Sequence, residues 1–172
     1  MNSKFNATRG FGVLLSAFML LLPFSATFGE DSPAPTAAED TASVDSIVVY
    51  KTPTCSCCSK WVDHLRANGF EVDVNTVPNT APTQARFGVP RQLGSCHTAK
   101  VGDYWVEGHV PAEIIQQLLD GKRDDIEGIA VPGMPAGSPG MESPNPVTYD
   151  VIAYGKDGKF YRFATVQGSN AG

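Results

Sequence analysis

The sequence predicts a mixed α/β domain, and three neighbouring segments support this fold class. Residues 46–50 (SIVVY) form a run of β-branched and apolar side chains that is typical of a buried strand. Apolar residues then recur with a helical period over residues 58–65, and residues 68–69 (Asn-Gly) supply a stop signal. Residues 70–77 alternate between apolar and polar side chains, as a half-buried strand does. A helix between two strands is the usual connection of a parallel pair, so we expect a sheet with a helix packed on it.

The following segments supply a short helix, two strands joined by a tight turn, and a longer helix. These segments are residues 82–87, 93–101, 104–110 and 111–121. Gly102 and Asp103 lie between the two strands and favour an antiparallel hairpin, while Pro111 suits the first position of the last helix. The resulting order, β-α-β-(α)-β-β-α, is that of a thioredoxin or glutaredoxin core. We therefore predict a thioredoxin-like core over residues 46–122.

A loop and a final hairpin are expected to extend this core. Residues 128–146 (GIAVPGMPAGSPGMESPNP) are rich in Gly and Pro, and a loop of this length in a compact domain is usually functional or disordered. Residues 147–154 and 160–166 flank a glycine-containing turn and predict a C-terminal β-hairpin. The predicted extension covers residues 123–167, in one domain that spans residues 46–172.

The N-terminal part of the chain predicts export. Lys4 and Arg9 precede an apolar run at residues 11–22, a pattern typical of a secretory signal peptide, which we assign to residues 1–29. The run is shorter than the roughly 20 apolar residues that a membrane span needs, so an uncleaved anchor is the less favoured alternative. Residues 30–45 are rich in Ala, Ser, Thr, Pro and acidic side chains and should form a disordered linker. No membrane contact is expected after cleavage.

Composition and motifs exclude several classes of function. The chain carries a net charge of −5 at pH 7, and the predicted signal peptide contains basic but no acidic residues, so the exported part is more acidic still. An acidic chain without a basic patch or interleaved aromatics does not suit nucleic acid. The sequence has no H-x-E or H-E-x-x-H motif, no Gly-rich phosphate loop and no Ser/His/Asp pattern, so hydrolysis and phosphate chemistry have no support.

Three of the four cysteines lie at the start of the first predicted helix, in the segment KTPTCSCCSKW. Unpaired N–H groups and the helix dipole favour thiolates there, and cysteines at such sites have pKa values of roughly 3.5–7.5. Thiolates at Cys55, Cys57 and Cys58 would be both nucleophiles and soft metal ligands. An exported chain with four cysteines could instead hold structural disulfides. Adjacent Cys57 and Cys58 cannot pair without strain, which leaves a small Cys55–Cys58 loop or a longer one that ends at Cys96.

The fourth cysteine precedes a histidine near the start of a predicted strand. In a thioredoxin-like core the segment that enters this strand crosses over the CxxC pair. Two registers are open, with either residues 89–90 (Val-Pro) or Cys96 and His97 at the crossing, and we favour the second. His109 ends the next strand of the hairpin and is expected near His97, whereas His64 is expected to face solvent.

These side chains, with two methionines of the Gly- and Pro-rich loop, form a soft ligand set. Cysteine and methionine select Cu(I), whereas Zn²⁺, the alternative metal, takes Cys and His and needs no thioether. We expect the loop to fold back over the cysteine helix, with Met134 or Met141 near the metal. A loop that merely links the core to the hairpin, with both methionines as packing residues, is the alternative.

Three blocks of the sequence resemble the signature blocks of the CopG-type family of exported copper-resistance proteins. They are VYKTPTCSCCSKW, LGSCHTAKVGDYWVEGHVPAEII and IAVPGMPAGSPGME. The resemblance implies a variant thioredoxin fold in a periplasmic protein of Gram-negative bacteria. It further implies redox cycling and copper bound by the cysteines of the C-x-C-C segment with help from Cys96 and His97.

The sequence therefore predicts a periplasmic protein of copper resistance that binds Cu(I), in one or several ions, with other periplasmic copper-handling proteins as its partners. The predicted ligands are Cys55, Cys57, Cys58, Cys96, His97, His109, Met134 and Met141. The alternative is a thiol–disulfide oxidoreductase with Cys55 as nucleophile and Cys58 as resolving cysteine, although such an enzyme has no need of Cys57. A third hypothesis is a disulfide-stapled module that binds a partner protein.

Overall fold

The structure is a computed structural model, and it describes residues 46–170. The predicted signal peptide (residues 1–29) and linker (residues 30–45) lie outside the described residues. The strands are β1 (Ser46–Lys51), β2 (Glu71–Thr76), β3 (His97–Val101), β4 (Tyr104–Glu107), β5 (Ile126–Ala130), β6 (Thr148–Gly155) and β7 (Phe160–Gln167). The helices are α1 (Ser56–Ala67), α2 (Ala81–Phe87), the 3₁₀ turn η1 (Arg91–Leu93) and α3 (Ala112–Gly121). Within the described part, no helix has the length and apolar character that crossing a membrane requires.

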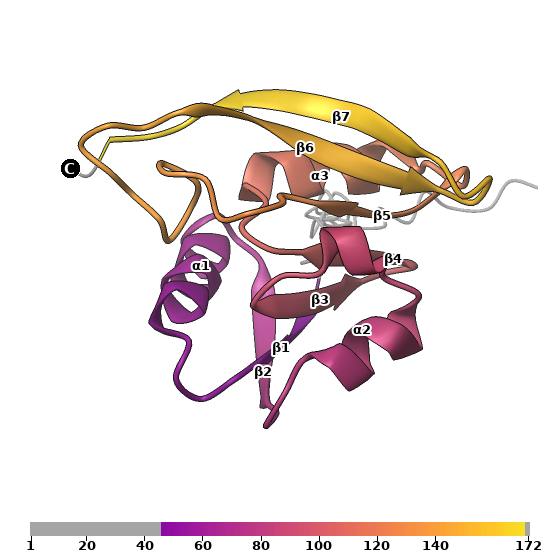
Figure 1. The fold of residues 1–172 in the computed structure, drawn as a ribbon, viewed down its shortest axis with the longest axis horizontal. Helices are drawn as coiled ribbons and strands as arrows, with labels where there is room; N and C mark the ends of the chain where they lie inside the picture. The colour runs from indigo at the N-terminus through magenta and orange to yellow at the C-terminus, as the bar shows by residue number, and fades with distance from the viewer. Residues whose placement is uncertain (1–45, 171–172) are drawn as a thin grey trace, which may run out of the picture. The chain divides into compact units, whose positions relative to one another are not determined.

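The described strands form one sheet with the order β2-β1-β3-β4-β5-β6-β7 (Figure 1). β1 lies parallel to β2 and antiparallel to β3, and β3 forms an antiparallel hairpin with β4. α1 connects β1 to β2, α2 precedes β3, and α3 follows β4. The predicted order of elements in the core is therefore confirmed.

The sheet continues through β5, a strand that the sequence prediction missed. Residues 128–130 belong to this strand, although the prediction placed them in the Gly- and Pro-rich loop. β5 pairs parallel with β4 and antiparallel with β6, so it joins the core to the C-terminal hairpin. The predicted hairpin is confirmed as β6 and β7, and each of its strands ends one residue later than predicted.

Two hydrophobic clusters lie on opposite faces of the sheet. Side chains alternate between faces along a strand, so Val106 of β4 packs in the larger cluster and its neighbour Trp105 in the smaller one. α1 and α3 cover the face of the larger cluster, through residues such as Trp61 and Ile115. α2 lies against the other face, where Phe87 packs on the smaller cluster. The sheet is thus sandwiched between α1 and α3 on one side and α2 on the other.

Three predicted boundaries move because of local turns. The strand predicted over residues 93–101 begins only at His97, because η1 occupies the start of that segment. The strand predicted over residues 104–110 ends at Glu107, since Gly108 adopts a φ of 72° and turns the chain. Helix α2 starts one residue before the predicted segment, and α3 starts one residue after it.

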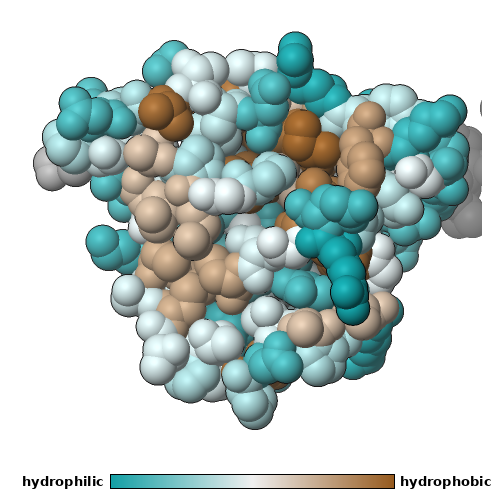
Figure 2. All heavy atoms as spheres, in the orientation of Figure 1, coloured by the Kyte–Doolittle hydropathy of each residue, from teal (hydrophilic) through white to brown (hydrophobic). Residues whose placement is uncertain are grey.

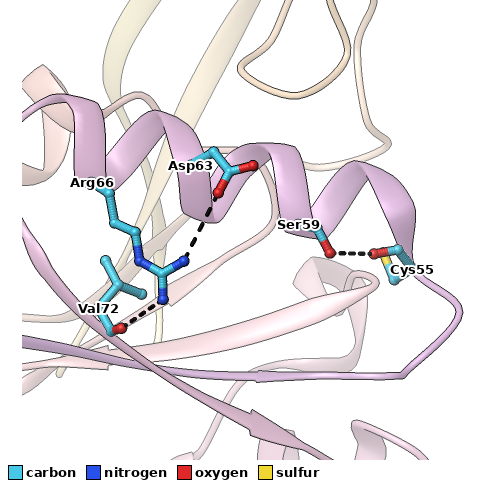
Figure 3. A network of polar contacts seen from close by, with 5 residues as sticks. All are labelled: Cys55, Ser59, Asp63, Arg66 and Val72. Atoms are coloured by element: carbon cyan, nitrogen blue, oxygen red, sulfur yellow. Dashed lines mark hydrogen bonds and ion pairs between the residues drawn. The ribbon is translucent and has the colours of Figure 1, made fainter.

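The solvent face of α1 carries polar contacts along its length (Figure 3). Ser59 donates a hydrogen bond to the carbonyl oxygen of Cys55 at 3.4 Å. Arg66 lies 3.9 Å from Asp63 and donates to the carbonyl oxygen of Val72 at 3.0 Å. The ion pair is exposed and contributes at most about 1 kcal/mol. The buried, apolar face of α1 therefore does most to hold the helix on the sheet.

Candidate metal centre

The four cysteines of the chain lie together where α1 and β3 begin. Cys55 caps α1, and its sulfur accepts a hydrogen bond from the backbone N–H of Cys58 at 3.3 Å. Cys57 lies in the same first turn, and Cys96 directly precedes β3. The four sulfur atoms lie within 4.8 Å of one another, which makes them a group that could hold a metal ion.

The pairing of β3 with β1 explains how Cys96 reaches the start of α1. Lys51, the last residue of β1, pairs with His97, the first residue of β3. The sulfur of Cys96 consequently lies 3.4 Å from the sulfur of Cys58. Val89, which marked the other register, packs in the smaller hydrophobic cluster on the α2 face of the sheet. The favoured register, with Cys96 and His97 at the crossing, is confirmed.

One pair of the four cysteines is oxidised. Cys55 and Cys58 form a disulfide bond, whereas Cys57 and Cys96 are free thiols. The sulfur of Cys57 lies 3.5 Å from that of Cys55, so each free thiol contacts one sulfur of the disulfide. Of the disulfides that the sequence left open, the short one is formed and the longer one to Cys96 is not.

Two histidines form a second potential ligand group with Cys96. Ligand atoms of Cys96, His97 and His109 lie within 4.8 Å of one another. The sulfur of Cys96 is 3.5 Å from Nδ1 of His97 and 3.5 Å from Nε2 of His109. The two imidazole rings meet edge to face at 5.1 Å, as the predicted hairpin required, and the ring of Trp61 lies 4.3 Å from His97. Cys96 thus belongs to both groups and connects them.

Burial keeps both imidazoles neutral. Burial, together with the nearby His109, lowers the pKa of His97 to about 3, and burial also lowers the pKa of His109. Nδ1 of His109 lies 2.7 Å from the carbonyl oxygen of Pro139, which can only accept. Nδ1 therefore carries the hydrogen, and Nε2 presents its lone pair towards Cys96. A neutral imidazole with a free lone pair is the form that binds a metal ion.

Burial also affects the protonation of the Cys96 thiol. Burial raises the pKa of this thiol, and a hydrogen bond from Ser95 offsets the effect only in part. Cys96 is therefore protonated at neutral pH in the metal-free protein. Ligation of a metal ion by this sulfur must release the proton.

The segment between β5 and β6, residues 131–147, is named the covering loop, because part of it packs against α1, beside which it lies in Figure 1. A Cβ atom on Gly140 would lie 2.6 Å from the carbonyl oxygen of Cys57 and 3.0 Å from the backbone nitrogen of Trp61. The neighbouring Pro139 is held by the hydrogen bond from His109. The prediction that this loop folds back over the cysteine helix is confirmed.

A surface pocket of about 410 Å³ opens between the covering loop and α1. Its lining includes Cys57 and Lys60 of α1 and Met134, Met141 and Glu142 of the loop. In Figure 2 the surface over α1 and the adjoining loop is mostly white to light brown, with hydrophilic residues around it. Met134 is 41% exposed and Met141 is half-buried. Both methionines thus line an opening beside Cys57, and their role as ligands stays a prediction.

The prediction that His64 faces solvent is wrong. This side chain is half-buried, and its Nε2 accepts a hydrogen bond from the backbone N–H of Ala112 at 3.1 Å. Burial lowers the pKa of His64. His64 therefore joins α1 to the start of α3, and the two helices are too far apart in sequence for a local pattern to reveal this contact.

Sequence reasoning also missed Glu107, which is fully buried on β4. Its Oε1 accepts hydrogen bonds from the backbone N–H of Ser95 (2.5 Å) and from Nε2 of Gln84 (2.8 Å). Burial raises the pKa of this carboxyl group to about 7, against the opposing hydrogen bonds. The available signal was a single acidic residue within the otherwise apolar strand segment YWVEGHV.

Comparison with known proteins identifies the family. Two solved structures, described as copper resistance protein CopG in forms 1 and 2, are each 41% identical to the chain, with a TM-score of 0.67. The chain matches 98% of each of them, and the match covers 72% of this chain for form 1 and 71% for form 2. The chain belongs to the CopG family.

A family profile described as a protein of unknown function, DUF411, matches residues 93–141 of this CopG homologue. That segment contains Cys96, His97 and His109 together with much of the covering loop. The likeness to the CopG structures supports a thioredoxin-like fold for the chain. No curated protein matches the chain.

Proposed function

We propose that this CopG homologue binds Cu(I) in the periplasm through Cys55, Cys57, Cys58 and Cys96, with His97 and His109 completing the site. The observation that carries this proposal is the group of four sulfur atoms within 4.8 Å, joined through Cys96 to two buried imidazoles. Thiolates are the ligands that Cu(I) prefers, and neutral imidazole is also a suitable ligand. The name of the similar structures, copper resistance protein, agrees with this metal.

The oxidation state of the cysteines controls how many ligands the centre offers. With the Cys55–Cys58 disulfide intact, only Cys57 and Cys96 have free sulfur atoms. Reduction by two electrons gives four thiols in the same volume. Thiolate sulfur can bridge two metal ions, so the reduced centre suits a cluster of several Cu(I) ions.

The surroundings favour copper over zinc. Zn²⁺ takes Cys and His ligands in a closed tetrahedral site and makes no use of thioethers. Met134 and Met141 line the pocket beside Cys57, and their uncharged sulfur atoms suit Cu(I) without adding to the repulsion among thiolates. We propose that this pocket is the entrance for copper delivered by other periplasmic copper-handling proteins.

Thiol–disulfide exchange is the second candidate function, and the Cys55–Cys58 disulfide at the start of α1 favours it. In this reaction the Cys55 thiolate attacks a substrate disulfide, which releases one substrate thiolate and leaves a mixed disulfide. The Cys58 thiolate then attacks the sulfur of Cys55 and releases the second substrate thiolate. Two electrons pass to the substrate, and the Cys55–Cys58 disulfide is the product.

Anaerobic titration of the periplasmic protein tests the first proposal. The fully reduced protein should bind Cu(I) more tightly than Zn²⁺, and the protein with its disulfide intact should bind fewer Cu(I) ions. Cys57→Ser, which leaves the Cys55–Cys58 pair in place, should weaken copper binding. Tighter zinc binding, or no copper binding by the reduced protein, would overturn the proposal.

An insulin-reduction assay separates the two candidates. Exchange requires Cys55 and Cys58 alone, so Cys57→Ser should leave any such activity unchanged. If the wild-type protein reduces insulin and the Cys57→Ser variant binds copper like the wild type, exchange becomes the better description of the function.

A further inference from the structure

Glu107 and Gln84 form a buried polar pair next to Ser95, on the face of the sheet opposite α1. Glu107 alternates with Val106 along β4, so its side chain points to the α2 face, where it is fully buried. Gln84 of α2 donates from Nε2 to Oε1 of Glu107 at 2.8 Å. No Lys, Arg or His side chain lies within ion-pair distance of this carboxylate in the part of the chain that the structure describes.

This pair holds both backbone polar groups of Ser95. The N–H of Ser95 donates to Oε1 of Glu107 at 2.5 Å, and the carbonyl oxygen of Ser95 accepts from Nε2 of Gln84 at 3.0 Å. The backbone pairing of β3 with β1 begins only at His97, so the sheet does not fix Ser95. The hydrogen bonds from Glu107 and Gln84 take the place of sheet pairing at this residue.

Ser95 immediately precedes Cys96, the cysteine that is shared by both ligand groups. A displacement of Ser95 would move the sulfur of Cys96, which lies 3.4 Å from Cys58 and 3.5 Å from Nε2 of His109. We propose that Glu107, with the help of Gln84, is the positioning residue that holds Cys96 between the sulfur group and the imidazoles. The expected effect of this positioning on Cu(I) affinity rests on the function proposed above, whereas the expected effect on the alkylation rate of the Cys96 thiol does not.

The chemistry of the pair explains why a carboxylate suits this place. A single carboxylate oxygen accepts two hydrogen bonds here, and Gln84 directs one N–H to each of its two acceptors. Burying a carboxyl group without a cationic partner costs free energy, so packing alone does not favour glutamate at this position. Loss of a group that orients a metal ligand without binding the metal itself typically lowers metal affinity about 10- to 100-fold.

The first experiment uses no metal and reads the Cys96 thiol directly. In a Cys57→Ser background with the disulfide intact, Cys96 is the remaining free thiol, and its alkylation by iodoacetamide can be followed by mass spectrometry. Glu107→Ala should raise the alkylation rate about threefold to tenfold, the factor that corresponds to the net free energy of one hydrogen bond. Glu107→Gln, which retains an acceptor oxygen, should restore most of the protection, and Gln84→Ala should give an intermediate rate.

A matched control separates positioning from loss of stability. Ile129→Val removes one buried methyl group from the neighbouring strand β5 without touching Ser95. All variants are compared at a temperature where circular dichroism shows them folded. If Glu107→Ala alkylates no faster than Ile129→Val, or if Glu107→Gln is no slower than Glu107→Ala, the positioning role is overturned. Should Glu107→Ala fail to fold, Gln84→Ala takes its place. Gln84→Ala should then be alkylated faster than both Ile129→Val and Glu107→Gln, and a rate no faster than that of Ile129→Val overturns the positioning role.

The second experiment titrates the reduced proteins with Cu(I) under anaerobic conditions. Glu107→Ala should weaken Cu(I) binding at least about tenfold, while Glu107→Gln should stay close to the wild type. Unchanged Cu(I) affinity in Glu107→Ala would overturn the link between this residue and the metal. If the wild-type protein itself bound no copper, the proposed function would fail, and the alkylation rates would still decide whether Glu107 positions Cys96.

Discussion

His109 donates a hydrogen bond of 2.7 Å from its Nδ1–H to the backbone carbonyl oxygen of Pro139. His109 follows β4, and Pro139 belongs to the covering loop, so a proposed metal ligand is directly joined to the segment that packs over it. If the loop moves away, the imidazole loses the partner that fixes its tautomer. The contacts of the loop should therefore influence how the centre holds copper.

Gly140→Ala should separate the covering loop from α1. The new Cβ atom would lie 2.6 Å from the carbonyl oxygen of Cys57, and a φ of 83° is strained for alanine. We expect the reduced, copper-loaded variant to transfer Cu(I) to a chromophoric chelator faster than the wild type. In the oxidised protein, alkylation of Cys57 should also become faster.

Gly133→Ala is the control for that variant. Gly133 has a φ of 78°, but a Cβ atom there would meet nothing within 4 Å, so the substitution adds backbone strain without a clash. Its transfer rate should stay near that of the wild type. Equal acceleration in both variants would show that strain in the loop, and not its contact with α1, is responsible.

The buried Glu107 predicts a pH-dependent difference in stability between the wild type and Glu107→Gln. The pKa of Glu107 is raised from 4.5 to about 7, so the unfolded chain loses this proton at lower pH than the folded chain. The contribution of Glu107 is fully present below pH 4.5 and is lost as the pH rises to about 7. The free energy of unfolding of the wild type should fall relative to that of Glu107→Gln by about 3 kcal/mol across this window.

Urea unfolding of the metal-free proteins from pH 4 to pH 8 measures this difference. His97, with its pKa lowered to about 3, has the opposite effect, since stability rises with pH as the unfolded histidine loses its proton. That effect is present in both proteins and cancels. A difference that does not change with pH would mean that Glu107 is already ionised in the folded protein.

The two buried tryptophans should respond differently to replacement by phenylalanine. Nε1 of Trp61 donates a hydrogen bond to the carbonyl oxygen of Val110 at 2.8 Å, whereas Nε1 of Trp105 has no hydrogen-bond partner among the described residues. Trp61→Phe leaves a buried acceptor unpaired, and Trp105→Phe removes an unpaired donor. Trp61→Phe should therefore destabilise the fold by at least about 1 kcal/mol more than Trp105→Phe. Denaturant unfolding of both variants measures this difference, and equal losses would contradict the hydrogen-bond argument.

Replacing Met134 and Met141 by leucine tests the thioether ligands. Leucine conserves the volume of methionine, so the double variant should lose less than about 1.5 kcal/mol of stability. If the thioethers ligate copper, the affinity for Cu(I) should fall about tenfold or more, whereas binding of Zn²⁺ should not change. Unchanged Cu(I) affinity and an unchanged rate of copper oxidation would identify both methionines as packing residues.

Local patterns predicted most of the fold. The strands and helices of the core follow from apolar periodicity, which acts over a few neighbouring residues. The sequence did not predict β5, because this strand has only five residues, IEGIA, and is followed by a Gly- and Pro-rich segment. Gly128 within it also looks like part of a loop, although its missing side chain makes room for the ring of Trp105. That reason is visible only once the two strands are paired.

The candidate site was predictable to the extent that sequence spacing determines geometry. The C-x-C-C segment at a helix start and the Cys96-His97 pair at a strand start meet because of the order of strands and helices, which the sequence predicted. Glu107 and His64 were missed or misplaced because their partners, Gln84 and Ala112, come from other helices. A side chain that is buried against a segment distant in the sequence leaves no periodic pattern in the residues around it.

The segments around the candidate metal centre are held in different ways, and this difference affects how a bound ion leaves. His97 is held by the pairing of β3 with both of its neighbours, and Cys96 follows Ser95, which Glu107 and Gln84 bind. The covering loop forms no strand and is held by contacts such as those of Pro139 and Gly140. Opening the loop therefore costs only part of the global free energy of unfolding. A departing ion can use a local fluctuation while the sheet stays folded, so the residence time of copper and the thermal stability of the protein can vary independently.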